Sequence, residues 1–199
     1  GHAYSVIEGI QSNEQIILGY CESQKQKNNP FQLEYIGNEK NIDLNSFRSE
    51  NVFFPCVGDN STREKIVEFI QSNQLRLTNV IHRNAYISKE VVFGNSNFIG
   101  NSVILNPASH IGNGTIINTR ALIEHECHIS DFVHIAPGVV LGGNVTIGKR
   151  SLIGAGSVVK PGIKIGKNCI IGAGSVVVKD IGDGLTYAGN PAKLIKNNE

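Results

Sequence analysis

An apolar residue recurs at every sixth position from Ile81 to Val177, without an interruption. An α-helix has about 3.6 residues per turn, so a period of six drifts around its surface and leaves no stable apolar stripe. A β-helix of six-residue units has this period, because each unit makes one strand and one corner and three units close a triangular coil. The repeat therefore predicts a parallel β-helix of roughly six coils, with the recurring apolar side chains inside.

Two further features of the repeat agree with this fold. The fourth residue after each recurring apolar position is mostly small or β-branched, and Asn97 is the exception. Glycine often follows the apolar residue directly, where a corner must let the backbone pass close to the next coil. These glycines are Gly94, Gly100, Gly112, Gly142, Gly148, Gly154, Gly166 and Gly172.

The composition of the 199 residues argues against several kinds of partner. With 18 basic and 17 acidic residues the net charge is +1, so neither a nucleic acid nor a membrane surface is an expected partner. The chain has no apolar run of about 18 residues and opens without a signal peptide, which predicts a soluble, cytoplasmic protein. The cysteines form no CxxC pair, so we expect reduced packing residues at Cys21, Cys56, Cys127 and Cys169.

Residues 1–79 predict a small Rossmann-like α/β domain in front of the β-helix, which takes residues 80–199 together with an irregular tail. Apolar spacing predicts a helix over 4–12, and short apolar runs predict strands over 16–20 and 52–57, the second of them buried. The opening helix should follow a strand and a glycine-rich turn. We therefore expect the natural protein to have a first strand that this chain lacks.

A second helix is expected to follow the second strand and to run to about residue 72. Ser61, with Glu64 three residues further on, predicts a capping box at its start. A ligand delivered by the strand would meet the N-terminus of this helix. Capping and turn formation explain Asp59 and Asn60 equally well.

Ionisable residues gather at one place in the glycine-rich, mostly apolar repeat, the segment Glu124-His125-Glu126. Cys127 faces inward by its phase in the repeat, which puts the residues before it on a corner open to solvent. An imidazole titrates near neutral pH, as a general base requires, and a neighbouring carboxylate could fix its tautomer. An exposed corner that happens to carry charge explains the segment equally well.

The sequence resembles the bacterial sialic-acid O-acetyltransferase family, which also contains the acetyltransferases of nucleotide-linked 4-amino sugars. The match covers nearly the whole chain, and its most specific piece runs from Ile123 to Cys127. The segments that carry the resemblance are Gly1-His2-Ala3, Gly58-Asp59-Asn60 with Arg63, Ile81-His82 through Ala85, Asn118-Thr119 through Cys127, His134, and Ala188-Gly189-Asn190-Pro191-Ala192-Lys193.

The resemblance implies a left-handed coil, an acetyl-CoA-dependent sugar acetyltransferase, and a homotrimer with CoA in the grooves between subunits. His125 matches the catalytic base of the family and Glu126 matches the acid that assists it, so the sugar amine or hydroxyl would attack the thioester directly. The oxyanion that forms needs a donor, and Gly143 lies 18 residues, or one coil, beyond His125. A backbone N–H near Gly142 or Gly143 is an expected donor.

Binding residues for both substrates are expected as well. For acetyl-CoA we expect His134, Gly143, Ala155, Ala173 and Lys193, and for the nucleotide sugar we expect His2, Glu22, Gly58, Asp59, Asn60 and Arg63. Some of these positions also have a simpler explanation, namely a surface histidine, small residues in corners or a solvated tail lysine. Relatives often carry an acidic pair where this chain has Cys21-Glu22, which leaves the sugar or base contact there open.

Proteins with other functions have the same β-helical prism. Carbonic anhydrases of the γ type bind zinc through three histidines, two of them in an HxxxxH pattern that this sequence lacks. His110 and His128 lie one coil apart and could stack as a metal pair, but no third ligand is evident. A non-catalytic sugar-nucleotide binder would not need the pair His125-Glu126. We therefore expect no metal and favour N-acetylation of a nucleotide-linked 4-amino sugar, with O-acetylation of sialic acid as the alternative.

Overall fold

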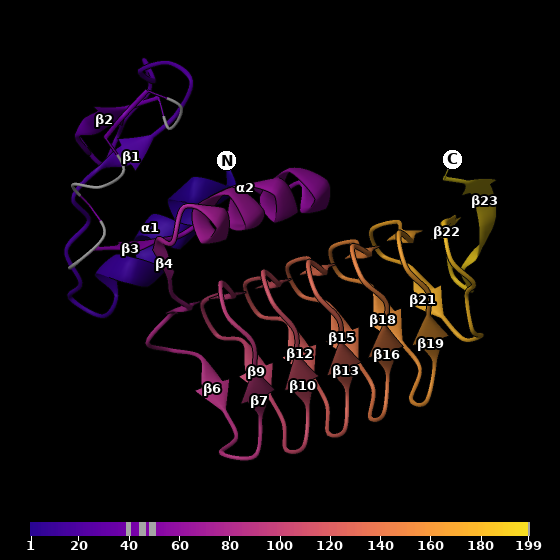
Figure 1. Cartoon of the computed structure of the whole chain (residues 1–199). Helices are drawn as coiled ribbons and strands as arrows, with labels where there is room; N and C mark the ends of the chain where they lie inside the picture. The colour runs from indigo at the N-terminus through magenta and orange to yellow at the C-terminus, as the bar shows by residue number, and fades with distance from the viewer. Residues whose placement is uncertain (39–40, 44–46, 48–50, 199) are drawn as a thin grey trace.

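The computed structural model describes residues 1–38, 41–43, 47 and 51–198. Most of this chain forms a three-sided parallel β-helix that begins at Val80, and two helices lie along one side of the prism (Figure 1). Strands pair in parallel with strands 18 residues away, as His110 pairs with His128, and the coil is left-handed. The fold predicted from the six-residue period is thereby confirmed.

Each side of the prism is one sheet of short strands stacked along the axis. The six-stranded sheet contains β6 (Tyr86–Ile87), β9 (Ile104–Leu105), β12 (Leu122–Ile123), β15 (Val140–Leu141), β18 (Val158–Val159) and β21 (Val176–Val177). The five-stranded sheet contains β7 (Val92–Phe93), β10 (His110–Ile111), β13 (His128–Ile129), β16 (Thr146–Ile147) and β19 (Lys164–Ile165). The eight-stranded sheet contains β5 (Val80–Ile81), β8 (Phe98–Ile99), β11 (Ile116–Ile117), β14 (His134–Ile135), β17 (Leu152–Ile153), β20 (Ile170–Ile171), β22 (Leu185–Ala188) and β23 (Lys193–Asn197).

The second residue of each two-residue strand points into the prism, as the repeat predicts. Ile123, Ile135 and Leu141 have no exposed surface, and each such side chain contributes about 1.5–3 kcal/mol through burial. The glycines at the corners are also explained. A Cβ on Gly148 would lie 2.5 Å from the carbonyl carbon of Gly166 in the next coil, a contact that a side chain cannot make.

The described residues of the front part form two helices and two short parallel strand pairs. Its elements are α1 (His2–Gln11), β1 (Tyr20–Cys21) paired with β2 (Tyr35–Gly37), β3 (Val52–Phe53) paired with β4 (Arg76–Leu77), and α2 (Asn60–Ser72). Helix α1 covers the outer face of the eight-stranded sheet, because Val6 packs in one buried cluster with Val80, Phe98 and Ile116. The front part is therefore attached to the first coils of the prism.

The two predicted front strands are shorter in the structure. Residues 16–20 were expected to form a strand, but strand geometry begins at Tyr20, and Ile16 and Leu18 are 86% and 56% exposed. Helix α1 packs on the prism and not on this run. The second predicted strand keeps two residues, Val52 and Phe53; Pro55, which lacks an N–H and cannot donate to a ladder, follows soon after.

The start of α2 also differs from the predicted capping box. The N-cap is Asp59, whose carboxylate accepts a hydrogen bond of 2.8 Å from the backbone N–H of Thr62. Glu64 does not reach back to the cap. Its buried carboxylate instead pairs with Lys149 at 2.7 Å and with Arg150, both on the prism. The carboxylate of Glu64 therefore attaches α2 to the β-helix.

Arg63 is the main polar link between α2 and the prism. Its side chain is 1% exposed, and its Nε donates to the carbonyl of Gly114 at 2.6 Å. The other guanidinium nitrogens donate to the carbonyls of Val57 and Gly58, to Asn60 Oδ1, and to the carbonyl of Phe132. Burial lowers the pKa of Arg63 to about 10, so the group stays charged at neutral pH.

The described helices include none that is long and apolar enough to cross a membrane. Cys127 and Cys169 are buried thiols inside the prism, in agreement with the packing role expected for them.

Substituting Arg63 should release the front part from the prism. Arg63→Ala leaves buried carbonyls without a donor, so we expect it to lower the free energy of unfolding of the front part by about 3 kcal/mol. Arg63→Lys should not restore it, because an ammonium cannot replace the planar fork. Urea unfolding followed by hydrogen exchange measures the change, and the exposed Lys65→Ala on the same helix is the control. Equal stability of Arg63→Ala and wild type would contradict this role.

Candidate active site

The corner after β12 carries the pair predicted to be catalytic. We call residues 124–127 the base corner. Cys127 points inward and is 1% exposed, while the side chains of His125 and Glu126 are 59% and 65% exposed. His125 Nδ1 lies 3.0 Å from Glu126 Oε2. A proton on Nδ1 satisfies this contact and leaves Nε2 as the ring nitrogen that can accept a proton.

The next coil brings Gly143 against the ring of His125. A Cβ on Gly143 would lie 2.6 Å from His125 Cε1 and 2.7 Å from Nε2. Any residue other than glycine would therefore displace the ring of His125. The N–H of Gly142 is used in the ladder, where it donates to the carbonyl of Val159. The N–H of Gly143 meets no acceptor within the described part of the chain. Of the two expected oxyanion donors, Gly143 is therefore the one that remains available.

One contact at the base corner was not anticipated from the sequence. Asn106, one coil before Glu124, donates from Nδ2 to Glu124 Oε2 at 3.1 Å. The 18-residue spacing between the two residues is the signal that could have revealed this contact. Glu124 is thereby held by the previous coil, whereas Glu126 contacts His125.

Ala155 and Ala173, expected to line a CoA groove, lie on another corner of the prism. We call these two residues the alanine corner. They follow β17 and β20 and are stacked one coil apart, since Gly174 N–H donates to the carbonyl of Ala155. Both are exposed, and neither backbone N–H has an acceptor among the residues described. Such stacked N–H groups can bind the amide carbonyls of an extended ligand.

The base corner and the alanine corner flank opposite edges of the six-stranded sheet. The base corner connects this sheet to the five-stranded sheet, and the alanine corner connects it to the eight-stranded sheet. One chain therefore does not bring His125 to Ala155 and Ala173.

A third group of expected residues gathers where the front part meets the eight-stranded sheet. We call His2, Gly58, Arg63 and His134 the seam. The rings of His2 and His134 are 6.2 Å apart, and His134 Nδ1 lies 3.3 Å from the carbonyl oxygen of Gly58. Burial, together with Arg63, lowers the pKa of both histidines to about 4. Both rings are therefore neutral at pH 7.

Two polar atoms of the seam have no partner in the described part of the chain. The Nε2 atoms of His2 and His134 are buried and make no hydrogen bond there. Buried polar atoms normally have a partner, so these two nitrogens are exceptions in this part of the chain. In this structure Asp59 caps α2, and Asn60 donates to the carbonyl of Arg150 on the prism at 2.8 Å.

The last two expected residues lie apart from these three groups. Glu22 follows β1, and its carboxylate accepts from the backbone N–H and the hydroxyl of Ser23. Lys193 opens β23 at the far end of the prism and lines a hollow of about 240 Å³ with Tyr187 and Pro191. The roles expected for Glu22 and Lys193 stay predictions.

His110 and His128 stack as expected, with ring centroids 6.1 Å apart. Within the described residues, no group of three or more His, Cys, Asp and Glu side chains is arranged to hold a metal ion. The three-histidine site of a γ-type carbonic anhydrase is thus not formed by this part of a single chain.

Three family models match the chain. Residues 1–70 match the PglD N-terminal domain, residues 126–161 match the bacterial transferase hexapeptide (six repeats), and residues 144–179 match the hexapeptide repeat of succinyl-transferase. GDP-perosamine N-acetyltransferase of Escherichia coli O157:H7 is 30% identical over 151 residues, which cover 73% of this chain and 68% of that protein.

Solved structures agree with these matches over nearly the full chain. PerB from Caulobacter crescentus, in complex with CoA and GDP-perosamine, superposes with a TM-score of 0.93 at 31% identity, over 98% of this chain and 93% of that one. The acetyltransferase domain of PglB from Neisseria gonorrhoeae FA1090, in complex with acetyl coenzyme A, gives 0.92 at 32% identity, over 98% and 95%. The chain belongs to the hexapeptide-repeat family of nucleotide-linked amino-sugar acetyltransferases that includes GDP-perosamine N-acetyltransferase.

Proposed function

We propose that this protein transfers the acetyl group of acetyl-CoA to the amine of a nucleotide-linked 4-amino sugar, with His125 as the general base. The observation that carries the proposal is the geometry of the base corner, where Glu126 contacts Nδ1 of His125 and Nε2 has no hydrogen-bond partner among the described residues. The relatives supply the substrate class, since PerB binds CoA and GDP-perosamine and PglB binds acetyl coenzyme A.

The chemical step then follows from three groups. The sugar amine attacks the thioester carbonyl carbon, and Nε2 of His125 takes the proton that the nitrogen loses. The oxyanion of the tetrahedral intermediate accepts a hydrogen bond from the N–H of Gly143. As the intermediate collapses, the carbon–sulfur bond breaks and the CoA thiolate takes the proton back from His125. Glu126 stabilises the transient imidazolium through the contact at Nδ1.

An amine acceptor is favoured over a hydroxyl by the relatives, whose names describe N-acetylation of perosamine. No feature of the base corner favours the alternative, O-acetylation of sialic acid, because one base serves both acceptors. The seam suits a nucleotide sugar, since it joins the N-terminus of α2 to two buried imidazole nitrogens that lack a partner. His2 and His134 are the residues that we propose for this contact, although His134 was expected from the sequence to bind acetyl-CoA.

The active site requires neighbouring subunits, and we propose a homotrimer. The outer face of the six-stranded sheet is a continuous apolar column in which Tyr86 is 62%, Ile104 40% and Val158 41% exposed. An uncovered apolar face is typical of a subunit interface. Packing three such faces around an axis would place the base corner of one subunit beside the alanine corner of its neighbour, with acetyl-CoA between them.

The direct test of the function is an acetyl-transfer assay with a panel of acceptors. We expect thiol release from acetyl-CoA with one of the GDP-, UDP- or dTDP-linked 4-amino sugars and none with free or CMP-linked sialic acid. His125→Ala should lower turnover by about two orders of magnitude while the protein stays folded. His128→Ala, on the adjacent strand, is the matched histidine control. Near-normal turnover of His125→Ala would exclude it as the base, and transfer to sialic acid alone would favour the alternative.

Gly143→Ala should damage catalysis without unfolding the protein. The new Cβ would meet the ring of His125 at 2.6 Å, and the exposed ring would have to move away from the thioester. We expect kcat to fall by about tenfold or more, as is usual for a misplaced catalytic group, with a nearly unchanged Tm. Gly182→Ala is the control, because its Cβ would meet the nearest neighbour, a Leu185 methyl, at an ordinary 3.8 Å. Equal kcat values for the two variants would show that the ring tolerates a methyl group at Gly143.

Val140→Glu should separate the proposed trimer. Val140 lies in the middle of the apolar column, and a buried carboxylate at a subunit contact costs several kcal/mol. Light scattering after size exclusion should show one 21.5 kDa chain in place of three, with loss of acetyl transfer. Thr146→Glu, in the next strand on the five-stranded sheet, should remain trimeric and active. A Val140→Glu variant that stays trimeric would place the interface elsewhere.

A further inference from the structure

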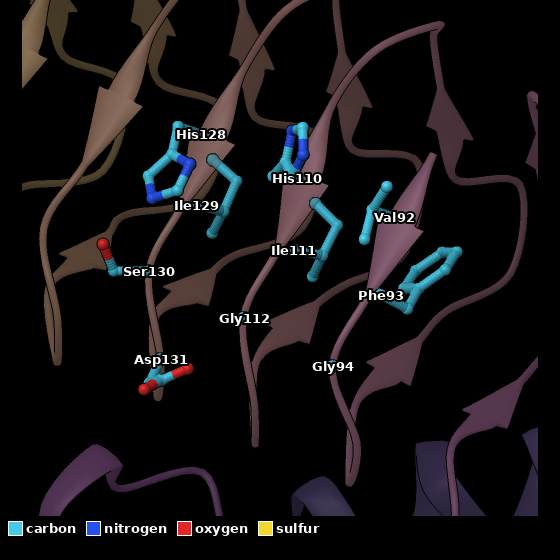
Figure 2. A pocket seen from close by; sticks show the side chains of 10 residues that line it. All are labelled: Val92, Phe93, Gly94, His110, Ile111, Gly112, His128, Ile129, Ser130 and Asp131. Carbon is cyan, nitrogen blue, oxygen red and sulfur yellow. The ribbon is translucent and has the colours of Figure 1, made fainter. Parts of the chain in front are cut away.

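Two histidines stand side by side on the outer face of the five-stranded sheet. His110 begins β10 and His128 begins β13, and the two residues are direct partners in the parallel register. Figure 2 shows both imidazoles on the same side of the sheet, at one end of a hollow of about 310 Å³. Ile111 and Ile129, the next residue of each strand, point into the prism and fix the outward direction of the two rings.

Neither imidazole is engaged by the rest of the described chain. Both side chains are exposed, and no hydrogen bond or ion pair within that part of the chain holds either ring. The ring centroids are 6.1 Å apart and the ring planes differ by 35°. Rotations about the side-chain bonds can therefore bring one nitrogen of each ring together without any movement of the backbone.

Two imidazole nitrogens at this position match the preference of borderline divalent transition metals. Zinc binds histidine nitrogen at about 2.0–2.1 Å, so two converging rings supply two adjacent coordination positions. Adjacent parallel strands lie about 4.8 Å apart, which keeps the two side chains within reach of a single ion. Magnesium and calcium prefer oxygen ligands and gain little from such a pair.

The neighbours of the pair supply no further ligand of this kind. Along the same column, Val92 comes one coil earlier and Thr146 one coil later. Asp131 lies at the other end of the hollow in Figure 2, and its Oδ1 accepts from the backbone N–H and the side-chain amide of Asn113. A bound ion would keep its remaining positions for water or for a ligand from outside the chain.

We propose that His110 and His128 form a surface site for one divalent transition-metal ion such as Zn²⁺, Ni²⁺ or Cu²⁺. The site is distinct from the acetyl-transfer centre, because its side chains leave the flat face of the five-stranded sheet and the base corner lies before β13. With two protein ligands the ion exchanges readily. It is therefore a reversible ligand of the folded protein and takes no part in the proton transfer at His125.

Isothermal titration of the untagged protein tests the site. At about pH 7.5 we expect one ion per chain, with Cu²⁺ bound more tightly than Ni²⁺ or Zn²⁺ and no binding of Mg²⁺. His110→Asn and His128→Asn should each weaken Ni²⁺ binding by about tenfold or more.

His125→Asn is the matched control, since it removes another exposed histidine and should leave Ni²⁺ binding unchanged. Equal Tm values of all variants without metal would show that the substitutions act on the ligands and not on folding. Three results would overturn the proposal: no binding to the wild type, undiminished binding to both His110→Asn and His128→Asn, or loss of binding in His125→Asn. The result does not depend on acetyl transfer, so it stands or falls separately from the proposed function.

Discussion

The pairing of each strand with the strand 18 residues away is the constraint on which the rest of this structure depends. This pairing stacks aliphatic side chains of successive coils inside the prism. Ile123, Leu141 and Val159 follow one another in this way, with at most 1% of their surface exposed. A one-residue shift in the register of a strand would turn its inward side chain outward. Since the interior must stay apolar, chemistry is confined to the corners and to the outward residue of each strand.

This confinement explains how the base corner is built. Along the prism axis, the base corner contacts residues of the previous coil on one side and of the next coil on the other. Neighbours in the site therefore lie about 18 residues apart in sequence. Asn106 holds Glu124 in this way, and Gly143 leaves room for the ring of His125. The geometry of the base corner therefore depends on residues of the coils on both sides of it.

The same reasoning separates what the sequence could predict from what it could not. The hexads fixed the phase of every coil, so the inward position of Cys127 and the exposure of His125 followed from counting alone. The front part has no such repeat. Arg63 was expected to bind the nucleotide sugar, and its burial was not predicted, because its acceptors include the carbonyls of Gly114 and Phe132, residues that no local pattern connects to it.

The prism also limits what a single subunit can do. The base corner and the alanine corner lie on opposite edges of the six-stranded sheet, and the seam lies on the eight-stranded side. The side chains between the two corners form the apolar column of Tyr86, Ile104 and Val158, which water solvates poorly. Covering this column with neighbouring subunits removes the apolar surface from water and brings the separated corners together. In the proposed trimer, the hydrophobic effect that stabilises the assembly is therefore also what completes the site, and a folded monomer would have a base without a thioester to act on.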